Sequence, residues 1–216
     1  MFVDRADAGQ RLARALVRYA DARDAVVLGV PRGGVVVAAE VANALRLPLD
    51  VVVASKVGAP GNPEYAVGAV APDGVVTPSE RERFTAEELR PLAAPVHAKI
   101  AHRLDAFRGG RSGLDVAGKT AIVVDDGIAT GLTVRAAVEY LRRRGASRVV
   151  VAAPVSAPDS RLMLERFADE VIVLDAPRGF YAVGQFYERF GQTEDAEVVR
   201  LLDEAHRRFA QGGAEA

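Results

Sequence analysis

Near the middle of this chain of 216 residues stands the stretch Ala121-Ile-Val-Val-Asp125-Asp126-Gly-Ile-Ala-Thr-Gly-Leu-Thr133. Its four leading apolar residues predict a buried strand, and the residues from Thr133 onward have the spacing of a helix. Between strand and helix lies a turn of small residues that begins with two acids. This order is typical of a parallel α/β sheet, in which the loop lies at the carboxyl end of the strand.

The same alternation extends along the rest of the chain. Helical patterns at about 35–46, 133–145 and 159–168 separate short apolar runs, one helix starts at Asp7, and another follows Thr193. The pattern predicts a single domain over residues 1–216, an α/β fold with a mostly parallel five-stranded sheet and helices on both faces. The runs predicted as strands are Ala25–Val30, Val51–Ser55, Thr120–Val124, Val149–Pro154 and Val171–Leu174.

The segment from about 72 to 118 interrupts this alternation. Thr85-Ala-Glu-Glu88 is a capping box that predicts the start of a helix, and Pro91 and Pro95 predict a kink or a restart of that helix. We therefore expect a helical insertion between the second and third strands, which ends in the loop at residues 108–113.

The composition excludes several classes of protein. Without cysteine, and with 3 histidines, the chain has no basis for a disulfide scaffold, a zinc ribbon or thiol chemistry. Its 28 basic and 29 acidic side chains nearly cancel, so nucleic acid, which needs a strong positive field, is not an expected partner. The sequence starts without a basic and apolar leader and has no apolar run near the ~20 residues of a membrane span, so we expect a cytoplasmic protein.

Four loops rich in glycine and polar residues follow predicted strands. They are Pro31–Gly34, Lys56–Tyr65, Asp125–Thr133 and Pro177–Gly184. In open α/β sheets, ligands bind outside the carboxyl ends of the strands, where loops and the amino ends of helices offer free amides. Turn formation alone does not explain four such loops at one edge, so we expect the functional site there.

The third of these loops has the composition of a phosphate cradle. Gly127 and Gly131 permit positive φ angles and a close approach of the backbone, which turns successive amides toward an anion. Thr130 and Thr133 add hydroxyl donors. The two acids directly before the cradle are placed to accept the two hydroxyls of a ribose whose 5′-phosphate lies in it. The structural alternative is that the acids end a strand and the loop only caps a helix.

The remaining motifs and the histidines do not define a second site. Gly113–Thr120 fits the P-loop pattern G-x-x-x-x-G-K-[ST], but a P-loop follows a strand and opens a helix, whereas this match follows a loop and opens a predicted strand. A Rossmann-type oxidoreductase is a weak alternative, because G-x-G-x-x-G is missing after the first strand. His97, His102 and His206 fall on predicted helices away from the four loops, so we expect them to pack or to face solvent.

Residues 121–133 resemble the phosphoribosyl-pyrophosphate (PRPP) signature of the type I phosphoribosyltransferases: four apolar residues, two acids and a small-residue phosphate loop. Val30–Gly34 is similar to the pyrophosphate loop of that family, and Lys56 follows the second predicted strand. Over its whole length the chain resembles a bacterial branch of stand-alone members. The resemblance implies a type I phosphoribosyltransferase fold with a small hood at about 177–210.

The resemblance implies a role for each loop. Asp125 and Asp126 would bind the ribose hydroxyls, and Arg32 and Lys56 would act with them as catalytic residues at the pyrophosphate. The pyrophosphate ligands would be Pro31, Arg32, Gly33 and Gly34. The ligands of the 5′-phosphate would be Gly127, Ile128, Ala129, Thr130, Gly131, Leu132 and Thr133.

Cofactor and partners follow from the same resemblance. Mg²⁺ would bridge the pyrophosphate through ligands from substrate and water, with no metal-ligating side chain expected. Besides Lys56, Arg108 or Arg111 is a candidate for closing over the leaving charge, and Ala59–Tyr65 would belong to a mobile cover. The substrates would be PRPP and a small-molecule acceptor, and the chain would form a homodimer.

Two features of the sequence bear on the acceptor. Enzymes of this family that act on 6-oxopurines carry an acid where this chain has Ala129, which disfavours hypoxanthine and guanine. Phe186 and Phe190 are expected to pack in the core, and Phe180 could do the same. The candidate acceptor residues, at the position of the family's hood, are Phe180, Tyr181 and Val183.

Two hypotheses about function therefore stand side by side. The first is a Mg²⁺-dependent phosphoribosyltransferase that transfers phosphoribosyl from PRPP to a nitrogenous base or related acceptor and releases pyrophosphate. The second is a catalytically silent regulatory protein of the same fold that senses PRPP or a nucleotide. Both require PRPP to bind at residues 125–133, and only the first requires turnover.

Overall fold

The computed structural model describes residues 1–212 and contains the expected five-stranded parallel sheet. Its strands are β1 (Ala25–Gly29), β2 (Leu49–Val51), β6 (Thr120–Val124), β7 (Arg148–Val155) and β8 (Glu170–Asp175). They lie in the order β2-β1-β6-β7-β8, and every neighbouring pair is parallel. The predicted α/β fold class is therefore confirmed.

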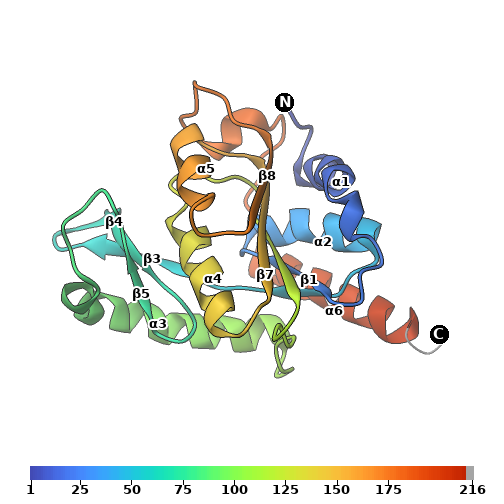
Figure 1. Cartoon of the computed structure of the whole chain (residues 1–216), viewed down its shortest axis with the longest axis horizontal. Helices are drawn as coiled ribbons and strands as arrows, with labels where there is room; N and C mark the ends of the chain where they lie inside the picture. Colours follow the sequence, from blue (N-terminus) through green and yellow to red (C-terminus); the bar gives the residue numbers. More distant parts are fainter. Residues whose placement is uncertain (213–216) are drawn as a thin grey trace.

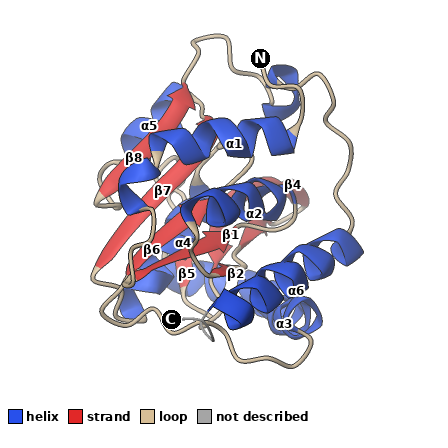
Figure 2. Ribbon diagram, turned by 90° about the vertical axis from the view of Figure 1, so that its right-hand side faces the viewer, coloured by secondary structure: helices blue, strands red, loops and turns tan. Residues whose placement is uncertain are grey.

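Helices cover both faces of this sheet (Figure 1). On one face lie α1 (Arg5–Ala15) and α2 (Gly33–Leu45), which Figure 2 shows in front of the strands, and on the other lie α4 (Leu132–Arg143) and α5 (Pro158–Leu164). Side chains of β1 alternate between the two cores: Val27 packs with α1 and α2, and Val26 and Leu28 pack with α4. Beside the β2 edge lie α3 (Ala86–Arg108) and α6 (Asp195–Gly212), and η1 (Val17–Tyr19) and η2 (Val183–Phe186) are short 3₁₀ helices.

A second sheet, which we call the outer sheet, corrects the prediction for residues 51 to 85. It is antiparallel and consists of β3 (Ser55–Ala59), β4 (Asn62–Val70) and β5 (Val76–Pro78), and it extends to the left of the main sheet in Figure 1. The predicted strand Val51–Ser55 thus ends at Val51, and the insertion begins as a sheet. Small residues in β4 and a register shift at Gly58 weaken the apolar alternation that normally reveals a strand.

The helical part of the insertion is α3, a helix of 23 residues that is not divided at either proline. The predicted restart at Pro91 or Pro95 is therefore wrong. The predicted capping box is confirmed: the Glu88 amide donates to Thr85 Oγ1 over 3.2 Å, and the Thr85 amide donates to the Glu88 carboxylate over 2.8 Å. Each proline removes one backbone donor, and the buried face of Leu89, Ala93, Ile100 and Phe107 holds the helix together across the gaps.

The first helix starts earlier than the sequence predicts. Asp4, not Asp7, is the N-cap of α1, and its side chain accepts a hydrogen bond from the Asp7 amide. Ahead of the helix, the Phe2 amide donates to the Phe186 carbonyl over 2.8 Å, so the amino terminus is paired with the segment that follows β8. This pairing brings the first turn of α1 to the carboxyl edge of the sheet. Among the described residues, none of the helices has both the length and the apolar character needed to cross a bilayer.

Candidate functional site

The loops after β1 and β6 meet at the carboxyl edge of the sheet, as the sequence predicts. A Cβ on Gly33 would overlap the Asp126 carboxylate, and a Cβ on Gly34 would lie 2.9 Å from Asp125 Oδ1. Only glycine fits at these two positions, because any larger residue would displace the carboxylates. The amino end of α2 therefore lies in contact with the acidic pair at the end of β6.

The loop after β6 presents a run of unoccupied amides. Three hydrogen bonds join the loop to β7 and to the start of α5. The Ile128 amide donates to Val155 O over 2.9 Å, the Ala157 amide donates to Ile128 O over 2.8 Å, and Ser160 Oγ donates to Ala129 O over 2.6 Å. In the part of the chain that the structure describes, the amides of residues 129–133 donate to no acceptor. Gly131 has a φ of 72° and is the N-cap of α4. Such amides at the start of a helix form an anion site.

The two acids at the end of β6 are held in a mostly buried position. The Asp126 amide donates to Asp125 Oδ1 over 2.9 Å. Burial raises the pKa of the Asp125 carboxyl well above its ordinary value, and the adjacent Asp126 charge raises it further, while Lys56 acts in the opposite direction. Burial also raises the pKa of Asp126, and the hydrogen bond from Arg5 opposes that shift. Without a ligand, the pair is therefore costly to keep ionised.

The sequence predicts Lys56 at the end of a core strand, but the structure places it on the outer sheet. It is exposed, at the second residue of β3, and its charge is close enough to Asp125 to lower the pKa of that carboxyl. Lys56 also lines a cavity of about 450 Å³ between the outer sheet, α4 and α5, together with Thr130 and Ser160. Ala59–Tyr65, the predicted cover, forms the turn and adjoining strand residues of the β3–β4 hairpin.

Three arginines considered for the pyrophosphate have acidic partners. Arg32 lies in the predicted loop Pro31–Gly34, directly after a cis peptide bond that joins it to Pro31. Its guanidinium lies 3.8 Å from the Asp195 carboxylate at the start of α6. Arg108 and Arg111, the two candidates for closing over the site, are both paired with acids other than Asp125 and Asp126. Arg108 donates twice to the buried Asp50 carboxylate, over 3.0 and 2.9 Å, and Arg111 pairs with Asp203 over 2.5 Å. The amides of Gly33 and Gly34, by contrast, have no acceptor among the described residues.

The predicted acceptor residues do not converge on the acidic pair. Phe180 stacks on Phe186 at 5.4 Å, and Tyr181 is 91% exposed. Val183 packs directly against Gly127, where a Cβ would collide with it. Of the three predicted acceptor residues, the structure thus brings only Val183 to the loop after β6.

Three residues near the acids were not found from the sequence: Arg5, Tyr187 and Phe190. Tyr187 donates its hydroxyl to the Asp126 carbonyl over 2.6 Å, and burial raises its pKa. Phe190, expected in the core, is 39% exposed, and the Arg5 guanidinium lies 3.9 Å from its ring centroid. For Tyr187 and Phe190 the sequence signal is the aromatic enrichment after β8, and Arg5 has none, because the pairing of Phe2 with Phe186 is not visible in a local pattern.

The remaining sequence interpretations of motifs and histidines are confirmed. Gly113–Lys119 is a loop that leads into β6, so the P-loop match has no helix after it. His97 contacts the Pro72 carbonyl at 2.9 Å, and His102 and His206 are exposed on helices. Across residues 1–212, no group of three or more histidine, aspartate or glutamate side chains could hold a metal ion. A Mg²⁺ ion would fit here only with phosphate oxygens and water as its main ligands.

Comparison with known proteins places this chain in a family. Residues 3–184 match the family described as phosphoribosyl transferase domain. The chain belongs to this family. It is 45% identical, over 99% of its length, to a Mycobacterium tuberculosis protein provisionally named a phosphoribosyl transferase, and it covers 49% of that protein. The chain thus spans about half the length of the curated relatives it matches.

A solved structure has a closely similar fold over nearly the whole chain. The protein TT1426 of Thermus thermophilus is 41% identical, with a TM-score of 0.81, and the match covers 94% of this chain and 98% of that one. A shorter match joins 42% of the chain to 28% of a ribose-phosphate pyrophosphokinase of Prochlorococcus marinus, at 39% identity. The fold and the family of this phosphoribosyltransferase-domain chain are therefore established.

Proposed function

We propose that this protein is a Mg²⁺-dependent phosphoribosyltransferase that transfers the phosphoribosyl group from PRPP to a nitrogenous base and releases pyrophosphate. The observation that carries the proposal is the run of unoccupied amides at residues 129–133 directly beside two mostly buried carboxylates. A phosphate monoester needs several converging donors, and a ribose diol needs charged acceptors. Both occur within one loop of this chain.

PRPP is bound in three parts in this proposal. Its 5′-phosphate accepts from the amides of residues 129–133 at the positive end of α4. Its two ribose hydroxyls donate to Asp125 and Asp126. Its pyrophosphate lies over the free amides of Gly33 and Gly34 at the start of α2. Each charge-assisted hydrogen bond contributes about 1.5–3 kcal/mol, so a handful of them suffices for micromolar binding.

The chemical step exchanges one bond at C1 of the ribose for another. The C1–O bond breaks and pyrophosphate leaves with the electron pair, while a ring nitrogen of the acceptor forms the new bond to C1 and its proton passes to water. Positive charge develops on the ribose as the bond breaks, and the ionised acids beside it stabilise that charge. Bound Mg²⁺ would neutralise the pyrophosphate as it leaves. Lys56, held on the outer sheet near Asp125, adds a positive charge at the same side.

The identity of the acceptor is proposed only at the level of a nitrogenous base. Ala129 follows Asp126 by three positions, has an exposed side chain and offers no acid to a purine N7. This composition favours an acceptor that does not need such an acid, in agreement with the expectation from the sequence. Because the chain spans about half of its curated relatives, the activity of the whole protein is part of the proposal.

The proposal is tested by calorimetric titration with PRPP and by pyrophosphate release in the presence of a panel of bases. Release that requires both Mg²⁺ and one of the bases supports the transferase. Binding of PRPP without release, for every base in the panel, would favour the sensing protein instead. Failure to bind PRPP at millimolar concentration, by folded protein with and without Mg²⁺, would refute both.

A further inference from the structure

Arg5 joins α1 to the acidic pair, although it lies in none of the predicted ligand loops. Its Nε donates to Asp126 Oδ2 over 2.7 Å, and its side chain is 13% exposed. The two residues are 121 positions apart in sequence. A buried arginine on a carboxylate of a ligand site is either structural or part of the binding machinery.

The Arg5 side chain is fixed by contacts on several sides. Its NH1 donates to Gly191 O over 2.7 Å, and its guanidinium lies over the ring of Phe190 at 3.9 Å. A Cβ on Gly33 would lie 2.6 Å from its Nε, so the pyrophosphate loop closes the remaining side. Together with the bond to Asp126, these contacts come from three separate parts of the chain, which leaves the guanidinium little freedom to move.

The contacts also determine what is left of the Asp126 carboxylate. Arg5 alone among the described residues forms an ion pair with it, and that bond uses Oδ2. Oδ1 accepts from no N–H or hydroxyl group of the described residues, and the carboxyl of Asp125 lies within hydrogen-bonding reach of the Asp126 carboxylate. A carboxylate held through one oxygen presents the other in a fixed direction, which lowers the cost of ordering it when a ligand binds.

We infer that Arg5 is a positioning residue for the ribose of the substrate: it fixes Asp126 through Oδ2 and leaves Oδ1 for a sugar hydroxyl. The inference rests on the proposed function, because it assumes that a ribose 5-phosphate group occupies the site. It assigns Arg5 no contact with the substrate itself. The competing explanation is that Arg5 only fastens α1 to the segment around Phe190 and Gly191.

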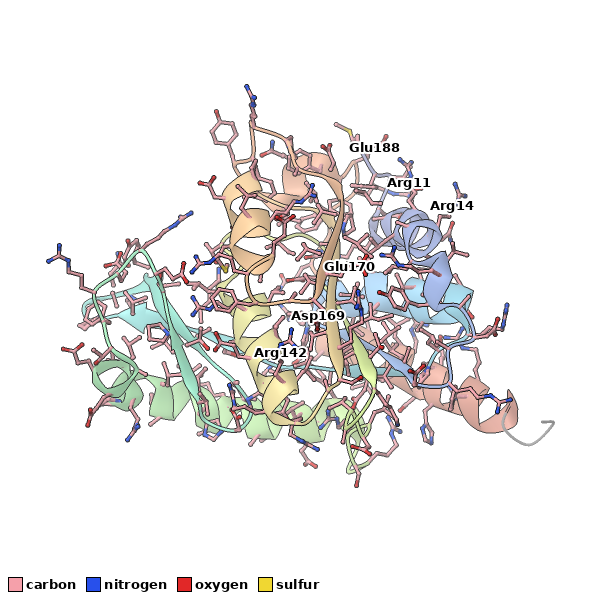
Figure 3. The ribbon with its side chains drawn as sticks, viewed as in Figure 1. Arg11, Arg14, Arg142, Asp169, Glu170 and Glu188 are labelled. Carbon is pink, nitrogen blue, oxygen red and sulfur yellow. The ribbon has the colours of Figure 1, made fainter. Side chains whose placement is uncertain are left out.

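A ratio of affinities distinguishes these explanations. Ribose 5-phosphate and 2,3-dideoxyribose 5-phosphate differ only in the two hydroxyls. The dissociation constant of the dideoxy compound divided by that of ribose 5-phosphate therefore reports the contribution of the diol. We expect Arg5→Gln to reduce this ratio at least about tenfold relative to wild type, because one charge-assisted bond loses its orientation. Binding of inorganic pyrophosphate should stay the same. Arg14→Gln, on the outer surface of α1 in Figure 3, is the matched control and should leave every value unchanged.

Each outcome decides the inference. Equal weakening of both sugar phosphates, with the ratio kept, would mean that Arg5 only fastens the fold, and loss of pyrophosphate affinity would mean that it contacts the anion directly. Either result overturns the inference. If wild-type protein binds neither sugar phosphate, the proposed function fails first, which is a separate result.

A second variant keeps the test decisive if Arg5→Gln does not fold. Phe190→Leu retains an apolar side chain on a partly exposed residue and removes the aromatic face under the guanidinium. We expect the ratio to fall about two- to fivefold, which is the effect of losing a cation–π contact. A ratio equal to that of wild type, in a variant with an unchanged melting curve, would overturn the inference.

Discussion

Asp125→Asn should weaken PRPP binding and stabilise the protein at the same time. Asn has the shape of Asp and keeps the Oδ1 that accepts the Asp126 amide at 2.9 Å. The substitution removes the ionisable carboxyl of Asp125, whose pKa is raised by burial and by the neighbouring carboxylate. One pKa unit corresponds to about 1.4 kcal/mol, and 1 kcal/mol shifts the Tm of a chain of this size by roughly 2–4 °C. We therefore expect the variant to melt higher at pH 7, by roughly 3–6 °C for each unit of the shift.

The pH dependence of this gain has a definite sign. A carboxyl whose pKa is higher in the folded chain than its ordinary value near 3.8 binds its proton more tightly when folded. Its contribution to stability therefore falls as the pH rises from that ordinary value through the raised one, and the asparagine variant escapes this loss. Differential scanning calorimetry should show a gap in Tm between variant and wild type that is larger at neutral pH than near the ordinary pKa of the carboxyl.

Binding moves in the opposite direction. Loss of one charge-assisted hydrogen bond of about 1.5–3 kcal/mol should weaken PRPP roughly 10- to 150-fold in a calorimetric titration. A variant that melts lower than wild type and binds PRPP equally well would refute the reasoning, because Asp125 would then be a structural strand-end residue.

Three further substitutions test other parts of the account. Gly33→Ala places a methyl group against the Asp126 carboxylate and should weaken PRPP at least about tenfold, a cost near 1.4 kcal/mol, with the circular dichroism spectrum unchanged; equal affinity would show that the two loops separate freely. Arg108→Met leaves the Asp50 carboxylate buried without its cation and should cost about 3–5 kcal/mol in urea unfolding. If Arg108→Met instead binds PRPP more weakly and keeps full stability, Arg108 acts at the site as the sequence predicts. Thr85→Ala removes the capping box of α3 and should cost about 1 kcal/mol, whereas an unchanged urea midpoint would contradict the role of the cap.

The core sheet and its ligand edge could be predicted because their signals are local. Each core strand is a short apolar run followed by a polar loop, and parallel order then places the loops after β1 and β6 side by side. The glycines of both loops are explained by contacts that leave no room for a Cβ, at Gly33 against Asp126 and at Gly127 against Val183. The pattern of residue types was therefore sufficient to predict that the loop after β1 and the acidic pair after β6 lie together.

The outer sheet was missed because its strands lack a clear period. In β4 the run Ala66-Val-Gly-Ala-Val70 mixes small and apolar residues, and four of its five members are buried, so no alternation remains. The prolines of α3 led to the prediction of a break that the structure does not contain. Local rules stop a helix at proline, whereas the packing of Ile100 and Phe107 in the core continues this one.

The ion pairs were beyond reach for a different reason. With 28 basic side chains, any arginine near a loop is a candidate, and only the fold selects its partner. Arg108 is the last residue of α3 and looks available in the sequence, but the structure pairs it with buried Asp50. Arg5 looks like an ordinary helix residue, but the pairing of Phe2 with Phe186 brings it to Asp126.

The amides of residues 129–133 are the proposed phosphate donors, and nuclear magnetic resonance can observe them directly. In a ¹H–¹⁵N correlation spectrum titrated with ribose 5-phosphate, we predict that these amides shift most and move downfield, as expected when free donors gain a phosphate acceptor. The amide of Ile128, already bonded to Val155, should move little. If the ligand binds and the large shifts lie elsewhere, with residues 129–133 unmoved, the loop is not a phosphate site and the central claim is contradicted.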